Sequence, residues 1–311
     1  MYRRPLTLLA GRKAASIYPN RPGRSTSHPA RFSRKTLPPG KRVSGQEWVI
    51  QEYVTRSLAV ADEASLDERR WAQPYGPLIA CLLFTGALIF ADVDAGFPDQ
   101  IALGAATFAM LWLCSHRLPA TDQRQIWVCV AISTAVELFA TQVWGVYRYR
   151  LLAVPLFVPP GHGLICYFGL AGARTPLMVK HGKAVCRAVV AFATAWAIAG
   201  LTVLPRITGR LDVEGALFLP SFLWLMWMTP RARDYAGTFL MASYVELLGT
   251  FGENWSWNPI LPVLGFPCAN PPSAAAGGYC WFGALALMAV AAFDSRRARA
   301  AATALNRLGS S

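Results

Sequence analysis

The segment IWVCVAISTAVELFATQVW, residues 126–144, is almost entirely apolar and holds one charged side chain, Glu137. A second segment, YAGTFLMASYVELLGTFG at residues 235–252, repeats this composition and also holds one charged side chain, Glu246. Each segment is close to the ~20 apolar residues that an α-helix needs to cross a bilayer. The two segments therefore predict membrane-spanning helices that each carry a single carboxylate.

The rest of the chain shares the character of these two segments. Of its 311 residues, 54% are hydrophobic and only 15% are charged, whereas soluble domains average about 25% charged residues. We therefore predict an all-α fold, a polytopic membrane helix bundle with about eight transmembrane helices. The expected apolar segments lie at 75–93, 100–115, 124–146, 162–180, 184–204, 214–229, 235–252 and 275–293.

Most of the net charge of +13 belongs to an N-terminal tail, because residues 1–46 contain eleven Lys or Arg and no acid. Their composition predicts a disordered tail. It also fits a transit peptide, a lipid-binding tail or an upstream start codon called in error, and these interpretations stay open. Residues 47–72 predict a short amphipathic helix. The remaining chain is nearly neutral, which does not indicate a nucleic-acid-binding face.

The loops between the apolar segments alternate between basic and poorly charged. Since basic loops favour the cytoplasmic side, we expect both termini in the cytoplasm, with the protein in a bacterial inner membrane. Residues 75–180 and 184–293 then form two parallel four-helix repeats, related by an axis along the membrane normal. Residues 294–311 are expected to form a basic cytoplasmic tail.

The two glutamates stand out because a charge near the bilayer centre costs ~2.5–3.5 kcal/mol on insertion scales. Each one either performs acid–base chemistry or hydrogen-bonds structurally to a neighbouring helix. Thr141 and Thr250 follow four residues later, on the same helical face. They bond either to the carboxyl groups or to their own backbone.

Loops rich in aromatic residues and proline follow both glutamates. They predict either an interfacial aromatic belt or a rigid aromatic lid over a cavity that both glutamates share. The predicted catalytic residues are Glu137, Glu246 and His162. The predicted substrate-binding residues are Thr141, Trp144, Tyr147, Arg148, Tyr149, Thr250, Trp255, Trp257 and Asn270.

Two motifs carry a family resemblance. Trp144-Gly145-Val146-Tyr147-Arg148-Tyr149, preceded by Glu137 and followed by Val154-Pro155 and Pro159, resembles a pattern of the bacterial and archaeal carotenoid hydratase-type membrane proteins. Gly265-Phe266-Pro267-Cys268-Ala269-Asn270 resembles the second element of that family. The family has a Trp shortly after the first proline pair, where this chain has Gly161-His162-Gly163. The resemblance implies addition of water to a terminal double bond of a polyene lipid.

Hydration of an isolated alkene requires a proton donor, stabilisation of a carbocation and delivery of water. A buried glutamate, aromatic ring faces and a second polar group supply these three functions. We therefore predict a hydro-lyase that acts on an isoprenoid or polyene lipid of the bilayer and uses no metal or nucleotide cofactor. Two alternatives stay open: a proton-coupled transporter or carrier of a small apolar molecule, and a non-catalytic subunit of a membrane complex.

Overall fold

The computed structural model describes residues 73–273 and 275–308 of the chain. The predicted basic tail at 1–46 and the predicted amphipathic helix at 47–72 lie outside the described residues. So do residues 309–311 of the predicted C-terminal tail.

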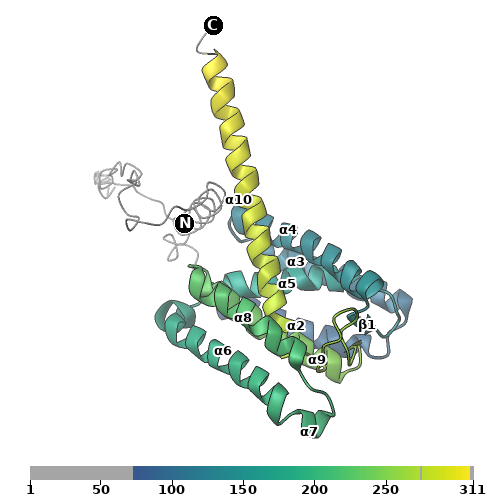
Figure 1. The fold of residues 1–311 in the computed structure, drawn as a ribbon. Coiled ribbons are helices and arrows are strands. Elements are labelled where there is room, and N and C mark those ends of the chain that lie inside the picture. The colour runs from purple at the N-terminus through teal and green to yellow at the C-terminus, as the bar shows by residue number, and fades with distance from the viewer. Residues whose placement is uncertain (1–72, 274, 309–311) are drawn as a thin grey trace, which may run out of the picture. The chain divides into compact units, whose positions relative to one another are not determined.

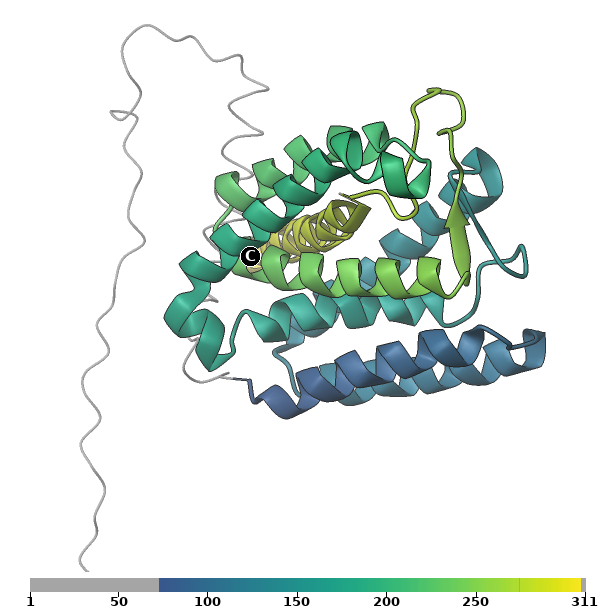
Figure 2. The same ribbon diagram turned by 90° about the horizontal axis from the view of Figure 1, so that it is seen from below.

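The first two helices form a hairpin at one edge of the helix bundle (Figure 2). Helix α2 spans Tyr75–Asp92 and helix α3 spans Phe97–Ser115. The backbone N–H of Gly96 donates to the Asp99 carboxylate at 2.9 Å, and a proline occupies the first turn of α3. These are ordinary start signals of a helix, and they explain why α3 begins so soon after α2 ends.

The next helix leads directly into the region that carries Glu137. Helix α4 spans Ala120–Leu138 and continues as a π-helix, η2, over Phe139–Trp144. Gly145 ends it with φ of 75°, a left-handed conformation that costs glycine little. A short strand, β1, then occupies Tyr147–Tyr149, and helix α5 spans Val158–Gly172.

The second part of the chain follows a similar order. Its elements are α6 Pro176–Thr202, α7 Pro205–Thr208, α8 Val213–Met228, α9 Ala232–Phe251, β2 Trp255–Trp257 and α10 Ala275–Leu308. One predicted boundary is wrong, because the break expected between residues 180 and 184 lies at 173–175. Thr175 caps α6 by accepting from the Met178 N–H at 3.4 Å, and Pro176 fits the first turn. This start signal overrides the apolar composition around it.

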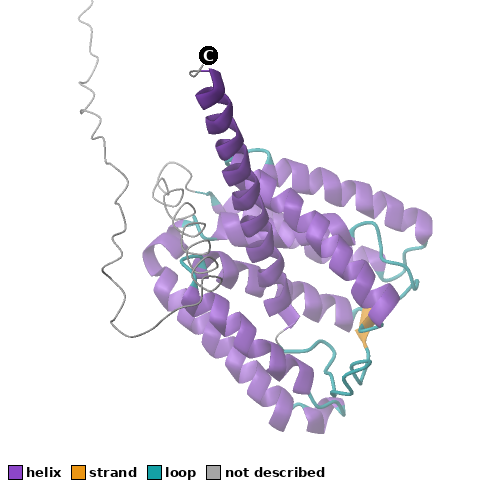
Figure 3. Cartoon of the chain, turned by 45° about the horizontal axis from the view of Figure 1, so that its top comes forward, coloured by secondary structure: helices purple, strands orange, loops and turns teal. Residues whose placement is uncertain are grey.

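Four helices surround the interior of the bundle. Helix α5 packs against α4 and α9, and α10 packs against the same two helices. The α5–α9 contact is close, because a Cβ atom on Gly237 would lie only 3.1 Å from the Cα of Gly169. Helix α3 packs on α5 and α8 packs on α10, while α6 lies beside α8 (Figure 1). The C-terminal part of α10 extends beyond the other helices (Figure 3).

The prediction of a helical membrane protein is confirmed in its general form. Among the described residues, five helices are long and apolar enough to cross a membrane: Tyr75–Asp92, Phe97–Ser115, Ala120–Trp144, Pro176–Thr202 and Ala275–Arg297. Helix α8 is also apolar but has only 16 residues. The count of eight spans stays a prediction.

The two short strands form the only sheet of the described residues and close one end of the bundle (Figure 3). They pair antiparallel, with Tyr147 opposite Trp257, Arg148 opposite Ser256 and Tyr149 opposite Trp255. Side chains alternate between the two faces of a strand. The four aromatic residues therefore share one face, and Arg148 and Ser256 share the other.

Candidate functional site

Glu137 and Glu246 occupy similar places in two helices that are far apart in the chain. Glu137 is the next-to-last residue of α4, and Glu246 lies in the last two turns of α9. Each residue is only 3% exposed. A carboxyl group at that depth has lost its hydration, so protein donors have to replace the lost water.

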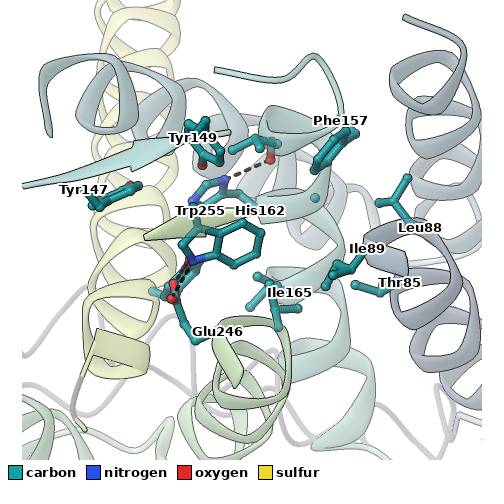
Figure 4. Close-up of a pocket in the computed structure, with 14 residues that line it drawn as sticks. Thr85, Leu88, Ile89, Tyr147, Tyr149, Phe157, His162, Ile165, Glu246 and Trp255 are labelled. Atoms are coloured by element: carbon teal, nitrogen blue, oxygen red, sulfur yellow. Dashed lines mark hydrogen bonds between the residues drawn. The ribbon is translucent and has the colours of Figure 1, made fainter. Parts of the chain in front are cut away.

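Glu246 accepts hydrogen bonds from three side chains. The indole Nε1–H groups of Trp255 and Trp257 donate to Oε2 at 3.0 and 3.1 Å, and the Tyr279 hydroxyl bonds to Oε1 at 2.6 Å. Figure 4 shows the indole of Trp255 directed at this carboxylate. Because an indole N–H only donates, Oε2 acts purely as an acceptor.

Glu137 has a different set of partners. The Tyr149 hydroxyl bonds to Oε1 at 2.6 Å, and the Nε2 atom of His162 lies 3.6 Å from Oε2. The other ring nitrogen of His162 lies 2.9 Å from the Val158 carbonyl oxygen. A carbonyl only accepts, so Nδ1 carries a hydrogen and Nε2 is the ring nitrogen that faces Glu137.

A stacked pair of rings connects the two carboxyl groups. The rings of His162 and Tyr279 lie 5.1 Å apart with an interplanar angle of 17°. His162 faces Glu137 through its Nε2 atom, while Tyr279 holds Glu246 through its hydroxyl group. The two acids, from α4 and α9, thus belong to one continuous chain of contacts.

Aromatic rings cover this chain on the side of the sheet. The rings of Tyr147 and Trp257 lie 4.6 Å apart, and those of Tyr149 and Trp255 lie 6.0 Å apart. Burial, followed by the charge of Glu137, raises the pKa of the Tyr149 hydroxyl well above its usual range. Tyr149 therefore keeps its proton and remains a hydrogen-bond donor.

A cavity of about 40 Å³ lies between these rings and helix α2 (Figure 4). This is enough for roughly three water molecules. The cavity is lined by Thr85, Leu88, Ile89, Tyr147, Tyr149, Phe157, Val158, Gly161, His162, Ile165, Val245, Glu246, Trp255 and Tyr279. Most of these side chains are apolar, and the ionisable groups converge from α5, α9, α10 and β1.

The two threonines on the helical faces of the glutamates do not bond to the carboxyl groups. The Thr141 hydroxyl donates to the Glu137 carbonyl at 2.8 Å, and the Thr250 hydroxyl donates to the Glu246 carbonyl at 2.6 Å. Of the two alternatives that the sequence left open, the backbone bond is the one found. Both threonines satisfy their own helix and do not line the cavity.

Three other predicted binding residues lie away from the cavity. The Trp144 indole donates to the Pro262 carbonyl at 2.9 Å and ties η2 to the loop beyond β2. Arg148 is exposed, because it occupies the outward position of β1 between two inward tyrosines. Asn270 is exposed as well, and its side-chain oxygen accepts from the Trp257 backbone N–H at 2.9 Å. Asn270 thus supports the strand that carries the tryptophans.

The most important residue that was absent from the predicted site is Tyr279. Its signal was present, since the cluster Tyr279-Cys280-Trp281-Phe282 opens the last apolar segment. It is the fifth residue of α10, as His162 is the fifth residue of α5. Phe282 packs beside both rings, with ring centroids 5.7 Å from His162 and 5.9 Å from Tyr279.

A buried polar network anchors the strands over the cavity. The amide groups of Gln100 and Asn254 donate to the two oxygens of Asp92 at 2.8 and 2.9 Å. Arg150 donates to the backbone carbonyls of Asp92 and Ala95 at 2.6 and 2.5 Å. The turn between α2 and α3 therefore holds the residues that flank β1 and β2 in place.

Comparison with protein-family models, with curated proteins and with solved structures finds no match. The resemblance to carotenoid hydratase-type proteins therefore stays a prediction. Among residues 73–273 and 275–308, no group of three or more His, Cys, Asp and Glu side chains is arranged to hold a metal ion.

Proposed function

We propose that this protein is an integral membrane enzyme that adds water across a terminal double bond of an apolar isoprenoid or polyene lipid. The observation that carries the proposal is the chain of contacts from Glu137 through His162 and Tyr279 to Glu246. It links Glu246, which lines an aromatic cavity within a helical bundle, to a second buried carboxyl group, Glu137. Such a site supports acid–base chemistry on a substrate that has no polar handle.

The proposed reaction begins with transfer of a proton to the less substituted alkene carbon. The π electrons form the new C–H bond, and a tertiary carbocation remains. Water then forms the C–O bond and releases a proton to a carboxylate, so that alkene and water give a tertiary alcohol. Proton transfer by a positioned side chain contributes typically 10²–10⁴-fold to the rate of such a step.

The size and lining of the cavity support separate places for the water molecule and for the lipid chain. About 40 Å³ accommodates water beside Glu246 and His162. The polyene chain itself would lie along the apolar side of α2, where Leu88 and Ile89 line the cavity, and only its end group would approach the acids. The proposed reaction needs no cofactor.

Internal duplication and eight spans are part of the same proposal. Helices α4 and α5 pack against each other as α9 and α10 do, and the two cross-contacts, α5 with α9 and α10 with α4, also correspond. β1 and β2 follow α4 and α9 and pair antiparallel, which suits a two-fold axis perpendicular to their sheet. With both termini in the cytoplasm of a bacterial inner membrane, this sheet would lie on the opposite side.

The test is product analysis with Glu137→Gln and Glu246→Gln variants, expressed in cells that supply polyene lipids. We expect the wild-type protein to yield a lipid heavier by the mass of one water and both variants to yield none. Thr141→Val is the matched control, because Thr141 bonds only to its own helix. Wild-type amounts of product from both Gln variants would refute the acid–base role. Absence of product from the wild-type protein with every polyene offered would refute the hydratase.

A further inference from the structure

Buried side chains separate the cavity beside Glu246 from the surrounding lipid. Thr85, Leu88 and Ile89, which form its wall on α2, are at most 5% exposed. The cavity volume of about 40 Å³ holds water molecules but no isoprenoid end group. A substrate dissolved in the bilayer therefore has to pass between two helices and widen the cavity as it enters.

Helix α9, which packs against α2, carries a row of exposed apolar side chains. Leu240, Leu247 and Phe251 are 42%, 46% and 82% exposed. Their spacing of seven and four residues places them on one helical face. Tyr244 belongs to the same row by spacing, since it comes four residues after Leu240, but it is only partly exposed. Within the proposed membrane bundle, this row faces lipid.

The side chain of Tyr244 reaches from this row across to α2. Its hydroxyl donates to the Leu82 carbonyl at 3.3 Å. Gly86 provides the space, because a Cβ atom there would overlap the Tyr244 hydroxyl oxygen and would lie 3.8 Å from Cδ1 of Leu248. We call this contact between the two helices, made by Leu82, Gly86, Tyr244 and Leu248, the α2–α9 seam. Tyr244 closes the seam on its lipid side.

The cavity lies directly behind the α2–α9 seam. Thr85 precedes Gly86 on α2, Val245 follows Tyr244 on α9, and both Thr85 and Val245 line the cavity. Figure 4 shows Thr85 on the α2 side of the cavity. Displacement of the Tyr244 side chain would therefore connect the cavity with lipid.

The other walls of the cavity are covered more firmly. Helix α5 is packed on by α3, α4 and α9. On α10, Tyr279 is held by its hydroxyl bond to Glu246 at 2.6 Å. The bond that closes the seam is longer, at 3.3 Å, and hydrogen bonds between membrane helices contribute little on average. The seam is thus the wall that one side chain opens at a small cost.

We infer that the α2–α9 seam is the entrance through which the end group of an apolar lipid passes from the bilayer into the cavity. Tyr244 is the residue that closes this entrance over Gly86, and it takes no part in the chemistry. The inference rests on the proposed function for the identity of the lipid. With its end group in the cavity, the remaining chain would pass between Gly86 and Tyr244 and lie in the bilayer.

The first test measures access to the cavity and does not depend on turnover. Thr85→Cys in a cysteine-free background places a thiol in the cavity wall, and the probe is methyl methanethiosulfonate, a small reagent that dissolves in lipid. Tyr244→Phe should raise the labelling rate about threefold, the equivalent of the ~0.6 kcal/mol average of a membrane hydrogen bond. Tyr244→Ala should raise the rate further, because it also removes the ring. Equal rates in all three proteins would overturn the inference.

Two controls separate an entrance from general loosening of the bundle. Leu83→Cys is 65% exposed on α2 as leucine, and its labelling should be the same with and without Tyr244→Ala. Tyr75→Ala removes a tyrosine from the start of α2, whose hydroxyl accepts from the Leu177 N–H at 3.1 Å, and should leave the labelling of Thr85→Cys unchanged. An equal rise with Tyr75→Ala and Tyr244→Ala would overturn the inference. So would equally fast labelling of Thr85→Cys by a charged, impermeant methanethiosulfonate, because the entrance would then face water.

The second test is a double-mutant cycle between Gly86 and Tyr244. Gly86→Ala pushes the Tyr244 hydroxyl aside and should raise the labelling rate of Thr85→Cys. In the Tyr244→Phe protein the nearest ring atom, Cζ, lies 3.4 Å from the added Cβ, so Gly86→Ala should then have no effect. Independent, multiplying effects of the two substitutions would overturn the inference.

The two proposals fail in different ways. Faster labelling with Tyr244→Ala, in a protein that forms no hydrated lipid, would uphold the entrance and refute the hydratase. Hydrated lipid formed by a protein in which Tyr244→Ala leaves the labelling of Thr85→Cys unchanged would uphold the hydratase and refute the entrance.

Discussion

Replacement of Gly249 by alanine should disrupt the site without touching an ionisable residue. Gly249 lies in α9, one turn after Glu246, and the indole of Trp255 packs directly on it. A Cβ atom at this position would lie only 1.9, 2.1 and 2.3 Å from Cη2, Cζ2 and Cζ3 of Trp255. Real Cβ atoms do not approach ring atoms so closely, so the indole has to move.

The indole has little room to move. Trp255 is 6% exposed and belongs to a cluster with Leu88, Tyr149 and Phe157. Overpacking of a buried site costs ~1–3 kcal/mol, and loss of the Trp255–Glu246 hydrogen bond costs ~1.5–3 kcal/mol. The higher helix propensity of alanine returns ~1 kcal/mol. We therefore expect Gly249→Ala to lower the free energy of unfolding by about 1.5–5 kcal/mol.

The assay is equilibrium unfolding in mixed micelles, titrated with dodecyl sulfate and followed by circular dichroism. Gly283→Ala in α10 is the matched control, because no atom lies within 4 Å of its added Cβ, and it should be neutral or stabilising by up to ~1 kcal/mol. In a double-mutant cycle, Trp255→Ala should remove most of the cost of Gly249→Ala. Wild-type stability of Gly249→Ala, or additive costs in the cycle, would refute the packing described above.

Three further predictions concern the loop beyond β2. Val263 is 94% exposed. Val263→Cys in a cysteine-free background should therefore react with an impermeant maleimide added outside intact cells. Labelling that occurs only after lysis would contradict the proposed orientation. Val263 also has φ of 71°, a left-handed conformation that costs a β-branched residue ~1–2 kcal/mol; Val263→Gly should therefore stabilise the protein by about 0.5–1 kcal/mol in the same unfolding assay, whereas Leu264→Gly should not. Burial, followed by the charge of Glu214, raises the pKa of the Cys268 thiol from 9.0. As the pH rises, the unfolded chain loses this thiol proton before the folded protein does, so the free energy of unfolding falls above about pH 9. Cys268→Ala should reduce that fall by ~1.4 kcal/mol per pH unit. At pH 7 the thiol is protonated in both states, so its ionisation does not contribute to the stability there.

The helices were predictable because their signals are local. Each apolar segment of the sequence contains a helix. A run of ~20 apolar residues is enough to predict a helix that crosses the membrane, and this composition is read directly from the sequence. The break between α5 and α6 was misplaced because Arg174 and Lys180 both looked like loop residues. Only the Thr175–Pro176 start signal distinguishes the two places.

The site was predictable only in part, because its geometry depends on contacts between distant segments. Two conspicuous glutamates and the aromatic residues after them were identified from composition. The pairing of β1 with β2 leaves no local signal, since strands of three residues have no detectable period. Without that pairing, the outward direction of Arg148 could not be foreseen. Tyr279 was not assigned to the site for the same reason, since it reaches Glu246 across 33 residues.

Each buried acid finds its partners within its own part of the chain, and this has a consequence for biosynthesis. Tyr149 lies 12 residues after Glu137, and Trp255 and Trp257 lie 9 and 11 residues after Glu246. Glu137 therefore meets Tyr149 within seconds of synthesis, before Glu246 has been translated, and Glu246 meets its two tryptophans equally soon after its own synthesis. Insertion of each carboxyl group into lipid does not have to wait for the complete bundle. The late step of assembly is then the joining of β1 to β2, which brings the aromatic partners of the two acids into contact.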